Sequence, residues 1–281
     1  MTKSAPLTIK DIARNLGVSV STVSRALKDH PDISPETKLM IQAFAEQGNY
    51  RPNVLALSLR RQKSYTIGLI IPAIVHHFFS SVISGMEELA YKEGYNLIIC
   101  QSNENQHREA INLQTLIDHR VDGILVSLSK TTQSFDPFIE AFESGLPIVF
   151  FDRVCPELET DRILTDDFQG GRIATEHLLK RGCKNILHLA APQHLLIGKG
   201  RYDGYCEALR SKGLELRKEL TLKCDTPEEV MALKNHLINL APHIDGIFAV
   251  NDSTAIAVIQ VLQKAGFSVP ENIAVVGFGD G

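Results

Sequence analysis

A polar face near the N-terminus carries the first side chains whose types suit a chemical role. Residues 20–27 have helical spacing, with their apolar residues on one side. The other side presents hydroxyls and one guanidinium, from Ser21, Thr22, Ser24 and Arg25. It has no carboxylate, so it suits contact with the phosphates and base edges of DNA. A plain helical hairpin without such a role is the alternative.

Two short helices must position this face. Thr8 and Asp11 have the spacing of a capping box, and the apolar residues around them recur at helical spacing, namely Ile9, Ile12, Ala13 and Leu16. Gly17 is expected to end this first helix, and Ser19 is suited to cap the second. Two short helices joined by a glycine-containing turn predict a helix-turn-helix.

A third helix and a short leucine-rich segment follow. Ser34 is a suitable cap and Pro35 a suitable first residue, and the expected core face comprises Leu39, Ile41, Ala43, Phe44 and Ala45. Residues 52–61 then begin with Pro52 and contain three leucines at alternate positions, Leu55, Leu57 and Leu59. This segment is either the start of the next domain or a hinge helix that inserts a leucine into the DNA minor groove.

The distribution of charge divides the chain of 281 residues. Residues 1–63, called the head below, hold 10 Lys and Arg against 5 Asp and Glu, a net charge of +5. Residues 64–281, called the body, hold the other 19 against 28, a net charge of −9. A small basic head on an acidic body is typical of a nucleic-acid-binding module joined to a second domain.

The body alternates between apolar strand patterns and helical patterns. Strands are expected at 66–71, 96–100, 123–128, 148–151, 185–190, 246–250 and 273–278. Helices are expected at 78–92, 108–119, 135–143, 170–180, 201–212, 227–240 and 253–265. This alternation predicts an α/β fold with parallel sheets flanked by helices.

A weak internal repeat divides the body further. Residues 121–126 are echoed by residues 244–249, and two shorter echoes have offsets of about 120. We therefore expect two similar lobes, lobe 1 at about 64–165 and lobe 2 at about 166–281. A ligand is expected between them, at the carboxyl ends of the strands. Polar residues follow several strands there: Asp152, Arg153, Thr165, Asp166, Asp167, Asn251, Asp252 and Asp280.

Residues 8–27 and 50–59 resemble the lactose-repressor (LacI/GalR) family of bacterial transcription regulators, and the stretch VSVSTVSRAL at 18–27 is highly specific. The resemblance implies that the second helix enters the major groove, where Val20, Ser21 and Arg25 read bases. It also implies a homodimer on a near-palindromic operator, with Leu59 intercalating in the minor groove. The expected DNA contacts are Thr8, Ser19, Val20, Ser21, Thr22, Ser24, Arg25, Tyr50, Asn53, Ala56 and Leu59.

The body of that family resembles sugar-binding periplasmic proteins and binds a small-molecule effector between its lobes. The effector contacts implied here are Phe78, Phe79, Asp152, Arg201, Asn251 and Asp280, whereas Asp166, Asp167 and Asp252 are interpreted as caps or surface residues. Gly279 separates Phe278 from Asp280, where the family often has Asp directly after the aromatic residue, which argues against a simple hexose. The family continues past the position of Gly281, so its C-terminal part is expected to be missing from this sequence.

Other classes of function find little support. The sequence lacks the GxSxG, Walker, HExxH and GxGxxG motifs of common enzyme classes, and residues 198–200 are interpreted as a flexible loop. Five scattered cysteines suggest a reduced, cytoplasmic protein without a metal site or other cofactor, and neither a signal peptide nor a membrane-spanning segment is expected. The sequence predicts a sequence-specific DNA-binding regulator, a repressor of carbon-source or sugar-utilisation genes that is controlled by a small-molecule effector. A soluble sugar-binding protein and a regulator controlled by a partner protein remain the alternatives.

Overall fold

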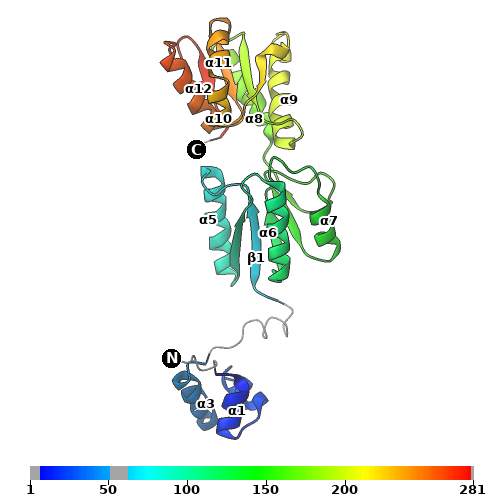
Figure 1. The fold of residues 1–281 in the computed structure, drawn as a ribbon, viewed down its shortest axis with the longest axis vertical. Coiled ribbons are helices and arrows are strands. Elements are labelled where there is room, and N and C mark those ends of the chain that lie inside the picture. Colours follow the sequence, from blue (N-terminus) through cyan, green and yellow to red (C-terminus); the bar gives the residue numbers. More distant parts are fainter. Residues whose placement is uncertain (1–6, 51–62, 280–281) are drawn as a thin grey trace. The chain divides into compact units, whose positions relative to one another are not determined.

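The computed structural model describes residues 7–50 and 63–279 and divides the chain into two compact units, residues 1–64 and 65–281 (Figure 1). This division lies one residue beyond the boundary expected from the charge distribution. The expected hinge helix and Asp280 lie outside the described residues. No described helix is both long and apolar enough to cross a membrane.

Three helices form the head: α1 (Ile9–Leu16), α2 (Val20–Ala26) and α3 (Pro35–Gln47). The predicted capping box is present, because the Thr8 hydroxyl accepts from the Asp11 amide and the Asp11 carboxylate accepts from the Thr8 amide. Gly17 ends α1 in the left-handed conformation, with φ of 64°. Ser19 caps α2 and Ser34 caps α3, so all three predicted helix starts are confirmed.

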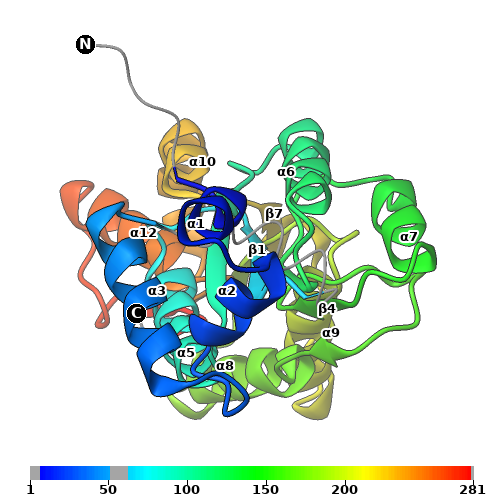
Figure 2. The same ribbon diagram turned by 90° about the horizontal axis from the view of Figure 1, so that it is seen from below.

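Figure 2 shows the helices of the head, α1, α2 and α3. They pack around one apolar cluster. Ile12, Val23 and Ile41, one from each helix, are fully buried in it. The prediction that Leu39 and Ala43 face this core is wrong, because both are exposed and the exposed fraction of Leu39 is 67%. They are one turn apart, on the face of α3 opposite Ile41, so the helical period places them in solvent.

Lobe 1 contains a five-stranded parallel sheet in the order β2-β1-β3-β4-β5. Its strands are β1 (Thr66–Ile71), β2 (Asn96–Gln101), β3 (Gly123–Val126), β4 (Ile148–Phe151) and β5 (Arg162–Ile163). The helices are α5 (His77–Lys92), α6 (Gln106–Asp118) and α7 (Asp136–Glu143). Ile70 packs in a cluster with Leu116 of α6, whereas Leu69 and Ile71 pack with Phe79 of α5, so both faces of the sheet are covered.

Lobe 2 contains a four-stranded parallel sheet in the order β7-β6-β8-β9. Its strands are β6 (Ile186–Ala190), β7 (Thr221–Lys223), β8 (Gly246–Ala249) and β9 (Ala274–Val276). The helices are α8 (Asp167–Lys180), α9 (Leu196–Ser211), α10 (Pro227–Ala232), α11 (Lys234–Leu240) and α12 (Asp252–Lys264), with short 3-10 helices η1 (Lys218–Leu220) and η2 (Ala241–His243). The first four strands of each lobe have the same order. The echoed segments 121–126 and 244–249 each consist of two residues followed by a strand, and these strands, β3 and β8, hold equivalent places in the two sheets.

Several predicted elements of the body differ from the structure. The short edge strands β5 and β7 were not predicted, and the helix predicted at 227–240 is divided at Leu233. Residues 198–200 were predicted as a flexible loop, but they lie inside α9. Here glycine serves close packing, because a Cβ atom on Gly198 would meet the Pro192 carbonyl and one on Gly204 would meet the backbone of α8. Arg201 therefore lies inside α9 rather than at its start.

Candidate DNA-binding and effector sites

The N-terminal end of α2 presents a polar, solvent-exposed surface. Ser19 Oγ accepts a hydrogen bond from the Thr22 amide at 3.0 Å and lies 2.7 Å from Ser21 Oγ. Val20 has an exposed fraction of 43%, and Ser21 is exposed beside it. Hydroxyls, one apolar side chain and the positive end of the α2 dipole thus face solvent together, which suits contact with phosphates and base edges.

Arg25 extends this surface at the C-terminal end of α2. Its side chain is 57% exposed, and Nη1 lies 3.8 Å from Asp32 Oδ2, which also lies 3.4 Å from His30 Nδ1. An exposed ion pair of this length contributes little free energy. The guanidinium of Arg25 can therefore leave Asp32 and bind another acceptor at little cost. A guanidinium in this state can donate a bidentate pair of hydrogen bonds to guanine.

The remaining predicted DNA contacts differ in their surroundings. Thr8 is exposed, although its hydroxyl serves the cap of α1, and Ser24 is half-buried. Tyr50 packs partly buried against the head core, and this burial raises the pKa of its phenol. Asn53, Ala56 and Leu59 lie outside the described residues.

Arg201 of α9 is the most completely bonded of the predicted effector residues. Nε donates to Asp167 Oδ1 at 2.8 Å, and Nη1 donates to the Val250 carbonyl at 2.7 Å. The guanidinium carbon lies 3.7 Å from the centre of the Phe278 ring, a cation–π contact. Residues from three other parts of lobe 2 thus fix the plane of this guanidinium, and the exposed fraction of its side chain is 12%.

Asp152, directly after β4, lies close enough to Arg201 for the two charges to act on each other. Its backbone has φ of 58°, a left-handed conformation that is costly outside glycine and common at functional sites. Ser127 Oγ donates to its Oδ2 at 3.2 Å. Burial raises the pKa of Asp152, and the positive charges of Arg153 and Arg201 partly oppose this rise. The structure therefore brings together a predicted residue from each lobe.

Other predicted effector contacts have structural roles. Phe79 is 4% exposed and packs in the core of lobe 1, whereas Phe78 has an exposed fraction of 48%. Asn251 caps α12 by accepting from the Thr254 amide, and its Nδ2 donates to the Asp225 carbonyl at 2.9 Å. Both polar atoms of Asn251 thus have partners within the protein, which favours the capping role over effector contact. Asp280 lies outside the described residues.

Sequence reasoning missed other members of this charged cluster. Asp167, interpreted as a cap or surface residue, is 8% exposed and bonded to Arg201, so that interpretation is wrong, whereas Asp166 does cap α8. Burial raises the pKa of Asp167, and Arg201 opposes the rise. Arg153 pairs with Glu104 at 2.7 Å. The position of Asp167 at an expected strand end was a sequence signal for a place in this cluster. No signal in the sequence pointed to Glu104.

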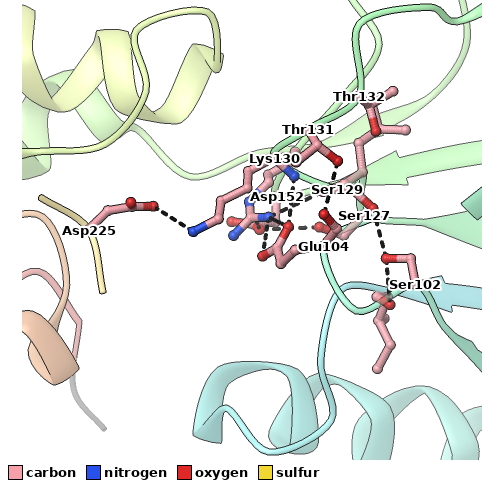
Figure 3. Close-up of polar contacts among 12 residues, drawn as sticks. Ser102, Glu104, Ser127, Ser129, Lys130, Thr131, Thr132, Asp152 and Asp225 are labelled. Carbon is pink, nitrogen blue, oxygen red and sulfur yellow. Dashed lines mark hydrogen bonds and ion pairs between the residues drawn. The ribbon is translucent and has the colours of Figure 1, made fainter. Parts of the chain in front are cut away.

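The cations of the cluster are matched by carboxylates. Arg201 pairs with Asp167 as described, and Arg153 pairs with Glu104. Lys130 of lobe 1 lies 3.5 Å from Asp225 of lobe 2 (Figure 3). A ligand that meets these residues therefore finds charges that are already neutralised, together with many hydrogen-bonding atoms.

Two further features bear on ligands. An apolar groove with a volume of about 490 Å³ lies between α8 and β9, lined among others by Ile173, Val276 and Phe278. Among residues 7–50 and 63–279, no group of three or more His, Cys, Asp or Glu side chains has an arrangement that could hold a metal ion. The five cysteines are free thiols, four of them buried.

Comparison with known families accounts for both units. Residues 8–53 match the family of bacterial regulatory proteins, lacI family. Residues 64–280 match the family described as periplasmic binding proteins and sugar binding domain of LacI family.

Individual relatives match the chain over most of their length. The chain is 32% identical over 273 residues to the HTH-type transcriptional repressor PurR of Actinobacillus pleuropneumoniae serotype 3 (strain JL03), covering 96% of this chain and 80% of that protein. It is 31% identical over 276 residues to the ribose operon repressor of Escherichia coli (strain K12), covering 97% and 83%. A solved complex of the transcriptional regulator CelR with cellobiose is 27% identical, with a TM-score of 0.66 and coverage of 96% and 82%. The chain belongs to the LacI family of DNA-binding transcriptional regulators.

Proposed function

We propose that the chain is a repressor that binds a near-palindromic operator as a homodimer and responds to a small-molecule effector held between the lobes of its body. The observation that carries this proposal is the exposed face of α2. There, Val20, Ser21 and Arg25 project from a basic head and make few contacts within the protein. One such face covers a half-site, and a two-fold dimer favours a two-fold site. In this role the protein acts in the cytoplasm and catalyses no reaction.

DNA binding is tested by selecting sites from a random double-stranded library with the full chain. The affinity for a selected site is then measured by fluorescence anisotropy at several salt concentrations. We expect a selected site with inverted half-sites and an affinity that falls steeply with salt, because phosphate contacts release counterions. Selection of single half-sites would contradict the dimeric mode. No DNA binding at low salt would favour the alternative, a solute-binding protein.

The charge balance of the body favours a neutral, hydroxylated effector such as a sugar. Asp167, Glu104 and Asp225 each neutralise one cation of the cluster, so an anionic ligand would have to displace a carboxylate. Hydroxyls, in contrast, can donate to carboxylate oxygens and accept from guanidinium groups that are already in place. Relatives named for ribose and cellobiose agree with this class of ligand.

Thermal unfolding with a ligand panel tests the class of effector. D-ribose, cellobiose, a sugar phosphate and a purine base represent the neutral, anionic and aromatic classes. A ligand present at 100 times its dissociation constant adds about 2.7 kcal/mol to the free energy of unfolding, which is readily seen as a rise in melting temperature. Stabilisation by the sugar phosphate alone would contradict the neutral class. No stabilisation by any member would favour control by a partner protein.

The hinge hypothesis extends the proposal to Leu59, which lies outside the described residues. We propose that Leu59 inserts between base pairs at the operator centre, at a cost of a few kcal/mol of unstacking that the bent complex offsets. Leu59→Ala should then reduce operator bending and specific affinity while leaving effector affinity unchanged. A parental bend angle in this variant, measured by gel mobility of permuted fragments, would contradict the hypothesis.

A further inference from the structure

The loop after β3, residues 127–134, is hydrogen-bonded to a buried carboxylate of α6. Glu109 has an exposed fraction of 1%, and its Oε2 accepts from the Ser129 amide at 2.6 Å. Its Oε1 accepts from Thr132 Oγ1 at 2.7 Å. In the same loop, Ser129 Oγ donates to Ser102 Oγ at 2.8 Å (Figure 3). Burial raises the pKa of Glu109, while these hydrogen bonds favour its charged form.

A second carboxylate, that of Glu104, fixes the centre of the same loop. Its Oε2 accepts from the Lys130 amide at 2.7 Å, and its backbone carbonyl accepts from Thr131 Oγ1 at 2.9 Å. Arg153 Nη1 donates to Oε1 of the same carboxylate at 2.7 Å. The backbone of Lys130 is thus ordered in advance, so only its side chain loses conformational freedom when it makes a contact.

Lys130 bridges the two lobes by both its side chain and its backbone. Its ammonium lies 3.5 Å from Asp225 Oδ2 in the loop after β7, with side chains that are 25% and 11% exposed. Its carbonyl accepts from Nε2 of His194 in lobe 2 at 2.9 Å. The ion pair is shielded from water more than a surface pair, so the attraction between its charges is stronger than in an exposed pair.

The partner carboxylate is also held in place, but it is incompletely bonded. The Asp225 amide donates to Glu229 Oε2 at 2.8 Å, and its carbonyl accepts from Asn251. Asp225 Oδ1 is buried and has no hydrogen-bond partner among the described residues, and burial together with the neighbouring carboxyl of Glu229 raises the pKa of Asp225. An unsatisfied buried oxygen opposes the attraction to Lys130. The contact between Lys130 and Asp225 therefore contributes a small net free energy, as a switchable contact requires.

We propose that Lys130 and Asp225 are positioning residues that form an ionic latch between the lobes and set the angle between them before any effector binds. This latch acts without DNA and without effector. Its test is therefore independent of the proposed function.

The latch is tested by measuring the distance between the lobes in the full chain. Spin labels are attached to a ketone-bearing amino acid incorporated at Gln114 of α6 and Asn235 of α11, so that the native cysteines stay unlabelled. Pulsed electron resonance, with labelled protein diluted in unlabelled protein, then gives the populations of short and long distances. The variants are Lys130→Met, Asp225→Asn and the double variant. Lys92→Met is the matched control, because Lys92 pairs with Glu88 in the same helix.

Each single latch variant should lower the ratio of short to long distances about fivefold, because each removes one charge of the pair. The double variant should open no further than either single variant, Lys130→Arg should retain most of the short population, and Lys92→Met should match the parent. Thermal unfolding of each variant checks that the body is folded. A parental distribution in folded Lys130→Met, or additive opening in the double variant, would overturn the proposal.

Discussion

The proposed DNA-binding face of the head and the charged cluster of the body use the same kinds of side chain in opposite ways. In α2, Ser21 and Arg25 are exposed, and Arg25 has one loose ionic contact. In the body, Arg201 is 12% exposed and has a carboxylate, a carbonyl and an aromatic ring as partners. The difference suggests that a site for a large ligand keeps its donors free in solvent, whereas a site for a small ligand is ordered by internal bonds before the ligand arrives.

Removal of Arg201 should have the largest effect on stability. Arg201→Ala leaves the carboxylate of Asp167 buried without its partner, so the free energy of unfolding of the body should fall by about 3–5 kcal/mol. The control is Arg172→Ala, because Arg172 is 41% exposed and pairs with Glu176 at 3.7 Å, and it should cost less than about 1 kcal/mol. Chemical denaturation measures both. Equal losses in the two variants would show that the buried ion pair of Arg201 contributes no more to stability than an exposed ion pair.

Removal of Arg25 should affect DNA binding rather than stability. Arg25→Ala should cost about 1–3 kcal/mol in specific DNA affinity and relax base preference at one position, because a bidentate contact to guanine is lost. Competition with selected and random DNA measures the two affinities. Arg14→Ala on α1, 81% exposed, should weaken both equally if it contacts DNA at all. If Arg25→Ala lowers the affinity for selected and random DNA equally, Arg25 contacts a phosphate and not a base.

A buried histidine should make the stability of the body depend on pH. His188 is fully buried against Phe248, and burial lowers its pKa to about 4 from 6.5. Between these values the unfolded state binds more protons, so the free energy of unfolding should fall as pH decreases, by roughly 2 kcal/mol from this group between pH 7 and pH 5. Buried carboxylates with raised pKa values act in the opposite direction, so the comparison with a variant isolates the histidine.

His188→Phe keeps an aromatic ring in the stack and removes the titration. The free energy of unfolding of the parent minus that of the variant should increase with pH. Only the parent gains stability as the imidazole of its unfolded state loses a proton. Denaturation at pH 5, 6 and 7 measures this difference. The same pH slope in both proteins would show that His188 does not control it.

The smallest effect concerns the cap of α2. Ser19→Ala removes the acceptor of the Thr22 amide and should cost the head about 1 kcal/mol, whereas Ser19→Gly should cost only a few tenths. Ser21→Ala, at the neighbouring exposed position, should leave the melting temperature of the head nearly unchanged and weaken DNA binding. A loss of stability in Ser21→Ala as large as that in Ser19→Ala would mean that the exposed hydroxyls serve the fold.

The sequence predicted the head better than the body because its signals are local. Thr8 and Asp11, or Ser19 and Thr22, lie three residues apart, so their spacing alone predicts their hydrogen bonds. The order of strands and helices in the body was also largely correct, since apolar strands and helical periods are local patterns. The short strands β5 and β7 escaped, because two or three residues are too few to show a period.

The amino-acid sequence by itself determined the caps and turns of the head, the free polar face of α2, the alternation of strands and helices, and the repeat that divides the body. The tertiary structure decided which charges meet. Asp167 and Arg201 are 34 residues apart, and Glu104 and Arg153 are 49 apart. Lys130 and Asp225 belong to different lobes. Whether such residues become partners depends on how strands are ordered in the sheets and how helices pack on them, and no local spacing encodes that arrangement.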